Sequence, residues 1–403
     1  MATEELTLFQ PEEMGGVSLE EVIEAYYDCR RRKRNTVNAL EFEVDYERHC
    51  IDLWHELNSH TYQPRRSIAF VVEHPVKREI FAADFRDRVV HHLIARRMWP
   101  LLQAQFHPDS YSTQPGKGTL YGIQRVEQHI RECSAGYTLD CYIMKLDISG
   151  YFMSISKEAL YESVCHFLDG RYPAADMPML RYLLKETIFN RPDRNCVRKV
   201  PRYRWQGLPR NKTLFGTDGR VGLPIGNLTS QLLALLFLDP LDHLITGPWQ
   251  VPHYGRYVDD MVLVHPSKRH LLEVRRRISE WLAERGLKLH PKKMYLQHYA
   301  KGVLFVGGMI KPGRKYISHR TVSRLFAKVH YWNKVINGHS PLTAAQREKL
   351  LATMNSYMGM MCHYQAKRLF HRMRGRVSPS WYRFAYFAWR GRRCKMACKR
   401  NNS

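Results

Sequence analysis

The sequence predicts a mixed α+β protein in which short strands are set among longer helices. An apolar run, 142–146, reads as a strand that ends at the carboxylate of Asp147. A second stretch, 253–264, has apolar residues on both sides of a tight acidic turn, which is the pattern of a β-hairpin. Apolar residues at helical spacing predict longer helices over 121–133, 232–244 and 271–286.

The charge of the chain favours a polyanionic partner. Its 403 residues include 63 Lys and Arg against 38 Asp and Glu, a formal net charge of +25. Such an excess indicates nucleic acid, with an anionic membrane as the weaker alternative. The length allows two or three subdomains with substantial cores.

The chain is expected to be soluble and cytoplasmic. Its N-terminus lacks the pattern of a signal peptide, and its longest apolar run, 232–238, is far below the ~18 residues of a membrane span. The nine cysteines are scattered, which favours reduced thiols over a disulfide framework. Cys394 and Cys398 lie close together but lack two further ligands for a zinc site.

Three carboxylates are candidate metal ligands. Asp147 ends one strand, and Asp259 and Asp260 lie at the tip of the predicted hairpin. This is what a two-metal phosphoryl-transfer site requires, because two Mg²⁺ ions about 3.5 to 4 Å apart take oxygen ligands and clamp the attacking and leaving oxygens. The alternatives are a solvated acidic turn at 259–260 and a turn or helix-capping role for Asp147.

These motifs resemble those of reverse transcriptases. The stretch Tyr257-Val258-Asp259-Asp260 matches that family's signature, and Asp147 followed five residues later by Phe152 is similar to its first catalytic motif. The resemblance implies that Asp147, Asp259 and the carbonyl of Ile148 bind two Mg²⁺ ions, with Asp260 either a ligand or just outside the ligand set. Mn²⁺ is the expected substitute for Mg²⁺.

The resemblance also implies a right-hand polymerase. An N-terminal extension and the fingers are expected over 1–120, and a palm with an antiparallel sheet packed on helices over 121–312. A long basic insertion near 190–220 reads as a mobile loop. A helical, basic thumb is expected over 313–403. No segment reads as a ribonuclease H, maturase or endonuclease domain.

The N-terminal part carries the first basic run. Residues 1–60 read as helical, with a helix start near Ser18, and five basic residues follow at 30–34. Because adjacent cations repel one another, phosphate contact and a solvated face are equal alternatives for this run. The candidates for RNA contact here are Arg31, Arg32 and Arg34.

The segments 67–72 and 78–83 read as a hairpin, followed by a helix from Asp84 to Met98. The resemblance places Arg78 at the triphosphate of the incoming nucleotide, since a guanidinium suits phosphate, with Lys77 as the second choice. A surface ion pair of Arg78 with Glu79 or Asp84 is the alternative.

Further nucleotide contacts follow from the resemblance. Phe152 stands where the family places the ring that excludes a 2′-hydroxyl, although a core aromatic would need no such role. The stretch 286–293 is expected to form a strand and a basic turn, where Lys292 or Lys293 would neutralise the pyrophosphate leaving group. A solvated basic turn is the alternative.

Residues 222–231 resemble one subgroup of the reverse transcriptases. Most reverse transcriptases have Gln before the glycine and Pro after the serine, where this chain has Ile225 before Gly226 and Gln231 after Ser230. This pattern resembles the enzymes of diversity-generating retroelements, which misincorporate opposite template adenines. An apolar side chain in place of an amide removes a hydrogen bond that would fix the nucleotide, which weakens discrimination. Chance drift at a tolerant position is the alternative.

Template and primer contacts are expected at four further positions. The polar loop 109–119 contains two glycines and Lys117, where the family contacts its template, although such loops are often mere connectors. Phe305 and Gly307 resemble the strand that supports the primer end, and Tyr257 precedes the acidic pair.

The C-terminal tail mixes basic and aromatic residues, a pattern that suits phosphate contact and base stacking and also the core of a thumb. Its candidates for RNA contact are Arg390, Arg392 and Arg393. The resemblance implies template RNA, an RNA/cDNA hybrid and deoxynucleoside triphosphates as ligands, and a small basic accessory protein that oligomerises. It also implies a bacterial or phage source. Two alternatives stay open: a retron or phage-defence enzyme that adds untemplated nucleotides, and a non-enzymatic RNA-binding scaffold.

Overall fold

The structure is a computed structural model that describes residues 16–31, 36–73, 76–338, 341–390 and 393–398. The described residues form helices and short strands in alternation, which confirms the mixed α+β class. They divide into two compact units. Of the described residues, the first unit comprises those within 1–115, 146–250 and 272–293, and the second those within 116–145, 251–271 and 294–403.

The first unit is mainly helical. Helix α1 begins at Ser18, whose hydroxyl accepts from the amide of Glu21 while the Glu21 carboxylate accepts from the amide of Ser18, a capping box that confirms the predicted start. Its buried face packs on α3 and α4. The helices are α1 (Leu19–Arg30), α2 (Val37–Val44), α3 (Tyr46–Asn58), α4 (Phe85–Gln105), α6 (Tyr151–Ser154), α7 (Lys157–Leu168), α8 (Met177–Phe189) and α9 (Leu228–Thr246).

Helix α4 is longer than predicted. The expected end at Met98 is wrong, because the helix continues through Pro100 to Gln105. A proline inside a helix removes one backbone hydrogen bond. Met98 and Leu102 are buried on either side of it, and α4 packs against α9, so tertiary burial offsets the loss.

Helix α9 has the length and apolar composition of a membrane span, and 72% of its most apolar window is buried within the protein. That degree of burial is typical of a core helix. Among the described helices, no other one meets the same criteria.

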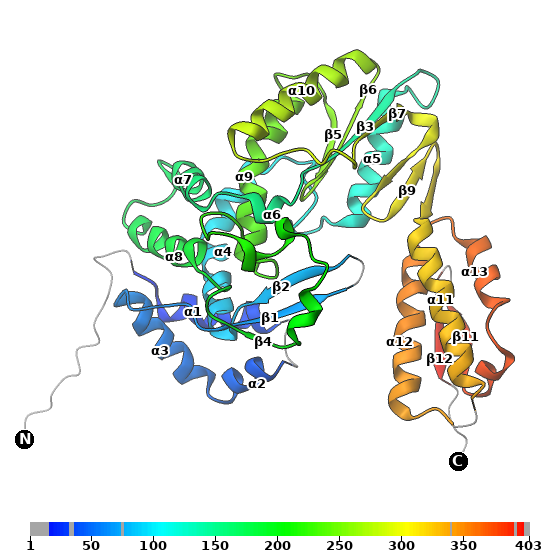
Figure 1. Ribbon diagram of the computed structural model, residues 1–403, viewed down its shortest axis with the longest axis horizontal. Helices are drawn as coiled ribbons and strands as arrows, with labels where there is room; N and C mark the ends of the chain where they lie inside the picture. Colours follow the sequence, from blue (N-terminus) through cyan, green and yellow to red (C-terminus); the bar gives the residue numbers. More distant parts are fainter. Residues whose placement is uncertain (1–15, 32–35, 74–75, 339–340, 391–392, 399–403) are drawn as a thin grey trace, which may run out of the picture. The chain divides into compact units, whose positions relative to one another are not determined.

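A three-stranded sheet, ordered β2-β1-β4, lies beside these helices (Figure 1). Strands β1 (Ser67–Val72) and β2 (Arg78–Ala82) form the predicted antiparallel hairpin, and β4 (Cys196–Arg198) pairs in parallel with β1. The third strand comes from the basic insertion, so the insertion is part of this sheet.

The insertion predicted as a long loop is therefore folded, and its mobility stays a prediction. It folds into three short 3₁₀ helices, η1 (Arg202–Trp205), η2 (Arg210–Lys212) and η3 (Leu214–Gly216). The fully buried carboxylate of Glu79 on β2 accepts hydrogen bonds from Trp205 Nε1, Thr213 Oγ1 and the amide of Leu214, each at 2.7 Å. Burial raises the pKa of Glu79 against the opposing effect of these donors. One acidic residue thus anchors the insertion.

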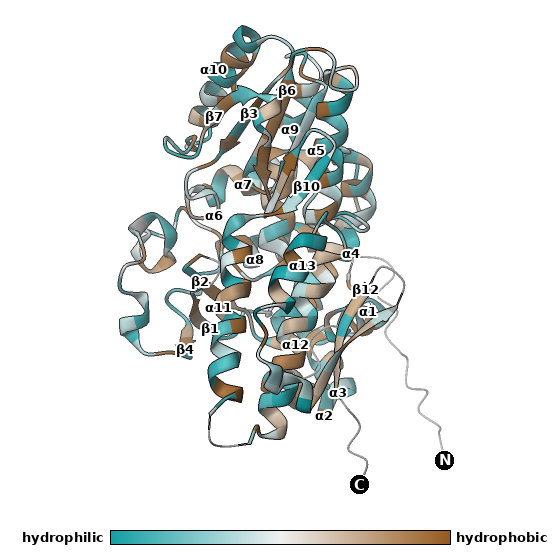
Figure 2. Cartoon of the chain, turned by 90° about the vertical axis from the view of Figure 1, so that its right-hand side faces the viewer, coloured by the Kyte–Doolittle hydropathy of each residue, from teal (hydrophilic) through white to brown (hydrophobic). Residues whose placement is uncertain are grey.

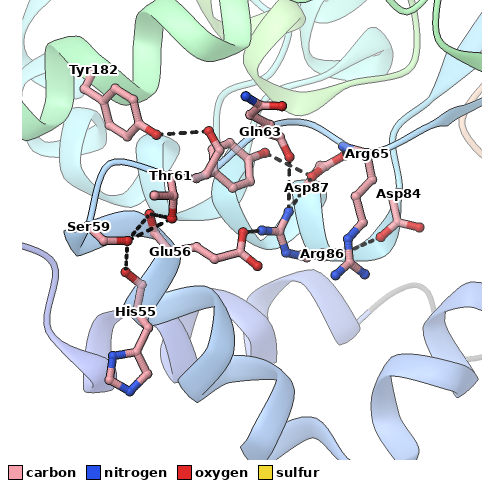
Figure 3. Close-up of polar contacts among 11 residues, drawn as sticks. His55, Glu56, Ser59, Thr61, Gln63, Arg65, Asp84, Arg86, Asp87 and Tyr182 are labelled. Atoms are coloured by element: carbon pink, nitrogen blue, oxygen red, sulfur yellow. Dashed lines mark hydrogen bonds and ion pairs between the residues drawn. The ribbon is translucent and has the colours of Figure 1, made fainter.

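A second buried polar cluster joins α3, α4 and the segment between α3 and β1 (Figure 3). Arg86 pairs with Glu56 and donates to the carbonyl of Gln63 at 3.3 Å. Asp87, which is 2% exposed, accepts from Tyr62 Oη at 3.0 Å and from the amide of Arg65 at 2.8 Å. Burial, with a smaller effect of Asp84, raises the pKa of Asp87 to about 6.

The second unit contains a four-stranded sheet ordered β5-β6-β3-β7. Strands β5 (His253–Tyr257) and β6 (Asp260–His265) form the predicted hairpin, and β3 (Tyr142–Asp147) pairs antiparallel with β7 (Tyr295–His298). Residues 261–264 are all buried, and Figure 2 shows β6 in the colour of hydrophobic residues. Helix α5 (Thr119–Cys133) packs on β5 and β6.

The predicted strand within 286–293 is wrong. Only Leu289 pairs there, in an isolated bridge with Ile148, and the true strand β7 begins after the basic turn. Helix α10 (Lys268–Glu284) precedes this turn.

A second small sheet and a helical subdomain complete the second unit. The sheet is ordered β10-β9-β8, with strands β8 (Val303–Phe305), β9 (Gly308–Lys311) and β10 (Arg314–Ile317). The helices are α11 (His319–Ile336), α12 (Ala344–Met361) and α13 (Lys367–Arg374). The shortest remaining segments are the 3₁₀ helices η4 (Tyr299–Lys301) and η5 (Pro379–Arg383).

The prediction of a helical fold through to the C-terminus is wrong. Strands β11 (Ala385–Arg390) and β12 (Arg393–Cys398) form an antiparallel hairpin. Ala385 and Met396 are buried in the same apolar cluster as Trp381 and the helices α11 and α12. The aromatics of the tail thus contribute to a core, as one alternative proposed.

The raised pKa of Asp87 predicts a pH-dependent stability. Because the folded pKa lies above the unfolded value of about 3.9, the folded protein binds more protons than the unfolded chain between about pH 4 and pH 6, so this group's contribution to stability is lost as pH rises. The unfolding free energy of wild type relative to Asp87→Asn should fall by about 2 kcal/mol across that range. Urea titrations measure it. Asp52→Asn, at an exposed position, is the control, and parallel wild-type and Asp87→Asn curves would contradict the prediction.

Candidate active site

Asp147 is held by the turn that follows α10. Its carboxylate, 6% exposed, forms an ion pair with Lys293, whose Nζ lies 2.9 Å from Oδ1 and 3.0 Å from Oδ2. Its carbonyl accepts from the amide of His290 at 2.7 Å, and the amide of Ser149 donates to the carbonyl of Lys288 at 2.8 Å. This pairing leaves out the carbonyl of Ile148, which is the group expected to bind metal.

The acidic pair sits on a strained turn. Val258 between the strands has φ of +58°, the left-handed region that a β-branched residue rarely adopts. The fully buried Arg256 donates from Nη1 to the carbonyl of Val258 at 3.0 Å. Asp259 is the turn residue that follows, and Asp260 opens β6 opposite Tyr257. Strained conformations of this kind concentrate at functional sites.

Asp260 has its own cationic neighbour. The Nζ of Lys145 on β3 lies 3.3 Å from its Oδ1, and both side chains are largely shielded, at 16% and 25% exposure. By donor type, the carboxylate oxygens and the carbonyl of Ile148 match the hard oxygen ligands that Mg²⁺ takes, and a bound cation would displace the lysines that pair with Asp147 and Asp260 here. The residues present therefore fit a divalent metal.

The expected nucleotide-binding residues of the first unit are joined by backbone hydrogen bonds. The amide of Leu223 donates to the carbonyl of Phe152 at 2.7 Å, and the amide of Phe81 donates to the carbonyl of Ile225 at 3.0 Å. Asn227 Oδ1 accepts from the amide of Ala83 at 3.3 Å. The stretch 222–231 thus connects the start of α6, beside Asp147, to β2.

Close packing explains the glycine in this stretch. Gly226 has φ of +124°, and a Cβ there would lie 2.9 Å from Ile80 Cγ2 and 3.1 Å from the carbonyl oxygen of Phe81. The half-buried Ile225 packs against an apolar cluster formed by Ala69, Phe81, Met153 and Leu214. Ile225 therefore has a packing role in this cluster, while Gln231 is exposed on the first turn of α9.

The basic side chains expected to contact the nucleotide differ in whether they are already paired. Arg78 is exposed at the start of β2, and neither of the two acids proposed to pair with it does so, since Glu79 binds the insertion and Asp84 caps α4. Lys77 donates to the carbonyl of Gln206 at 2.6 Å, so its ammonium is engaged. Of the two lysines at the basic turn, the exposed Lys292 lies outside the carboxylate contact that Lys293 makes.

The expected primer and template residues lie in the second unit. The ring of Phe305 is fully buried, so only its backbone is available to a ligand. Gly307 is exposed with φ of +90°, and a Cβ there would meet nothing within 4 Å. Lys117 is half-buried just before α5, and the side chain of Tyr257 is half-buried.

The RNA-binding candidates at the chain's two ends are only partly described. Arg31 is exposed and pairs with Asp28 at 3.0 Å. Arg390 and Arg393 face one another in register at the end of the β11–β12 hairpin. Arg32, Arg34 and Arg392 lie outside the described residues.

The helical subdomain has a groove of ≈ 1630 Å³ whose lining combines cations and aromatic rings. Arg314, Arg368 and Arg372 line it together with Tyr316 and Trp389. Trp389 is 58% exposed. Basic side chains beside exposed rings suit a nucleic-acid strand, because phosphates pair with the cations and bases stack on the rings.

Sequence reasoning missed three site residues. Arg256 and Lys145 are cations inside predicted apolar strands, and such placement next to carboxylates is a usable signal. No sequence signal pointed to Asn211, which lies in the insertion. Its carbonyl oxygen lies where a Cβ on Gly150 would come within 2.8 Å, so the insertion packs against the turn after Asp147.

A family model described as "Reverse transcriptase (RNA-dependent DNA polymerase)" matches residues 77–310. Among curated proteins, none matches the chain. Solved structures that match include an apo telomerase from Candida tropicalis truncated from its C-terminal domain, with TM-score 0.47 and 12% identity over 66% of this chain and 59% of that chain.

The full apo telomerase from Candida tropicalis matches with TM-score 0.48 and 11% identity, over 75% of this chain and 52% of that one. A telomerase from Candida albicans, in complex with a fragment of telomeric RNA, matches with TM-score 0.44 and 11% identity over 80% and 56%. The chain thus spans between 52% and 59% of these telomerase chains.

The ion pair at Asp147 predicts competition between Lys293 and a divalent cation. Lys293→Ala should tighten Mn²⁺ binding about five-fold, because an ion pair with one exposed partner is worth about 1 kcal/mol at most. Electron paramagnetic resonance of free Mn²⁺ measures the affinity. The neighbouring exposed Lys292→Ala is the matched control and should leave it unchanged. Equal affinities in the two variants would show that Lys293 does not cover Asp147 in solution.

Proposed function

Because the chain belongs to the reverse transcriptase family, we propose that it is an RNA-directed DNA polymerase that copies an RNA template into cDNA. The observation that carries the proposal is that the matched residues, 77–310, contain Asp147 and the pair Asp259 and Asp260. Asp147 ends a strand of the palm sheet, and the acidic pair lies at the turn between two strands of that sheet.

Each catalytic residue receives a role from its surroundings. Asp147, Asp259 and the carbonyl of Ile148 would hold two Mg²⁺ ions, which supply Lewis-acid activation of the attacking and leaving oxygens. Arg256 and Lys145 position the acidic pair, by fixing the Val258 carbonyl and the Asp260 carboxylate. Lys293, whose side chain is 53% exposed, is suited to neutralise charge on the pyrophosphate that leaves.

The residues of the first unit select the nucleotide. Arg78 offers a guanidinium that is free of the two acids considered for it and suits bidentate contact with a triphosphate. Phe152 is half-buried, with its ring against that of Tyr151 at a centroid distance of 5.7 Å. Tyr151 is itself fixed by a hydrogen bond from its hydroxyl to the carbonyl of Ala234. A ring held in this way can exclude a 2′-hydroxyl by contact with the sugar.

The finer part of the proposal is mutagenic retrohoming of a diversity-generating retroelement. It is supported by Ile225, Gly226 and Gln231 and by the apolar packing of Ile225, which leaves no side-chain amide at that position to fix a base pair. The partners proposed are a template RNA, the RNA/cDNA hybrid and a small basic accessory protein that oligomerises. The cationic groove of the second unit is a surface that suits RNA.

Loss of one catalytic carboxylate tests the activity. Asp259→Asn should lower cDNA synthesis about 1000-fold, a barrier increase of ~4 kcal/mol, because a neutral amide binds divalent cations weakly. Primer extension on an RNA template with Mg²⁺ and four deoxynucleotides measures it, and Asp52→Asn is the control. Retention of activity in cells by Asp259→Asn would favour the RNA-binding scaffold over the enzyme.

The same extension assay, run with the small basic protein encoded beside the gene, tests the subtype by sequencing the product. Errors concentrated at template adenines are expected. Faithful or untemplated DNA would keep the polymerase and move it to the retron or phage-defence class.

The apolar side chain at 225 should set the error rate at adenines. Ile225→Gln is expected to lower those errors about five-fold, since one hydrogen bond to a base pair is worth about 1 kcal/mol. Ile225→Leu keeps the volume and apolar character and should leave the errors unchanged. Sequencing of cDNA from both variants decides, and equal adenine error rates would remove this role from Ile225.

A further inference from the structure

A group of side chains in the second unit, separate from the carboxylates above, has the composition of a metal site. His129 and Glu132 lie on α5, and His253 is the first residue of β5, with one ligand atom from each within 4.8 Å of the others. Residues three apart on a helix lie on one face, and α5 packs against β5. The three ligands therefore come from two packed elements of one unit.

The side chains of His253 and Glu132 are within ion-pair distance but not hydrogen-bonded to each other. His253 Nδ1 lies 3.8 Å from Glu132 Oε2, which is too long for a hydrogen bond. The other oxygen of Glu132 accepts from Gln128 Nε2 at 2.7 Å, which orients the carboxylate. The two imidazole rings have their centroids 5.7 Å apart at 61°.

The three side chains of this group differ in their exposure to solvent. His129 is 3% exposed, His253 is half-buried and Glu132 is exposed, so the group opens to solvent on the side of Glu132.

We propose that His129, Glu132 and His253 bind one zinc ion. Two imidazole nitrogens and one carboxylate oxygen, with a fourth position open to water, form a donor set typical of zinc. Ligand atoms of a tetrahedral site with bonds of about 2.0 to 2.1 Å are roughly 3.3 Å apart, so small side-chain rotations close the present separation. Magnesium prefers oxygen ligands alone, which excludes the imidazole pair as a magnesium site.

The ion would act as a clamp. Strand β5 runs from His253 to Tyr257, and the strained turn with Asp259 follows directly. A metal bond between α5 and the start of β5 would fix the strand that delivers these carboxylates. This zinc site does not depend on the proposed polymerase activity, since its ligands are different residues.

The test uses the full chain, stripped of metal with a chelator and titrated with Co²⁺, whose tetrahedral complexes absorb visible light. Metal content by mass spectrometry after Zn²⁺ reconstitution gives the stoichiometry. One ion per chain is expected, with affinity reduced about 100-fold or more in Glu132→Gln and His253→Gln. Because Glu132 is exposed, its variant should fold even where His253→Gln does not, and circular dichroism checks both.

Two controls separate this site from other sources of metal binding. His298→Gln removes a histidine that pairs with a single carboxylate, Asp140, at 3.0 Å. Asp259→Asn removes a carboxylate of the proposed magnesium site. Both should keep the tetrahedral Co²⁺ spectrum. The proposal is overturned if neither ion binds stoichiometrically, if Glu132→Gln binds as tightly as wild type, or if Asp259→Asn alone abolishes binding.

Discussion

The ion pair between Asp147 and Lys293, with the backbone bonds around it, is the constraint on which the candidate site depends. A carboxylate that is 6% exposed needs a compensating charge or hydrogen bonds. Here one turn supplies both, since Lys293 provides the charge and His290 and Lys288 bind the main chain on either side of Ile148. The side chain is fixed by the same segment that fixes its backbone. The single bridge between Ile148 and Leu289 therefore holds Asp147 in place without a continuous strand at 286–293.

The turn that carries Asp259 and Asp260 is stabilised by a different set of contacts. Its turn places a valine in the left-handed region, which costs about 1 to 3 kcal/mol. The guanidinium of Arg256, buried beneath the turn, donates to the carbonyl of the strained residue and so offsets part of that cost. Lys145, on the neighbouring strand of the sheet, holds Asp260. Two cations within apolar strands thus support the turn, Arg256 at the Val258 carbonyl and Lys145 at the Asp260 carboxylate.

Local sequence patterns predicted those parts of the fold that depend on residues close together in the chain. The capping box at Ser18, the hairpins at 67–82 and 253–265 and the strand that ends at Asp147 were predicted, because turn residues and apolar periodicity act over a few positions. The pairing of β4 with β1, the anchoring of the insertion by Glu79 and the C-terminal hairpin were missed. The first two depend on partners more than a hundred positions away, which periodicity cannot identify. The C-terminal hairpin pairs nearby residues and was missed because the resemblance predicted a helical thumb there. The three ligands of the proposed zinc site escaped because His253 is more than a hundred positions from α5.

The stretch 222–231 shows how packing and selectivity share residues. Ile225 contributes its carbonyl to β2 and its side chain to the cluster that includes Leu214 of the insertion. An apolar residue there is required twice, once to fill this cluster and once, under the proposed function, to withhold an amide from the base pair. A glutamine would have to leave the cluster or bury an amide without a partner, at a cost of about 1 to 3 kcal/mol. Under the proposed function, fidelity and stability would be coupled at this position, and an enzyme that gained accuracy here would lose stability in the sheet β2-β1-β4.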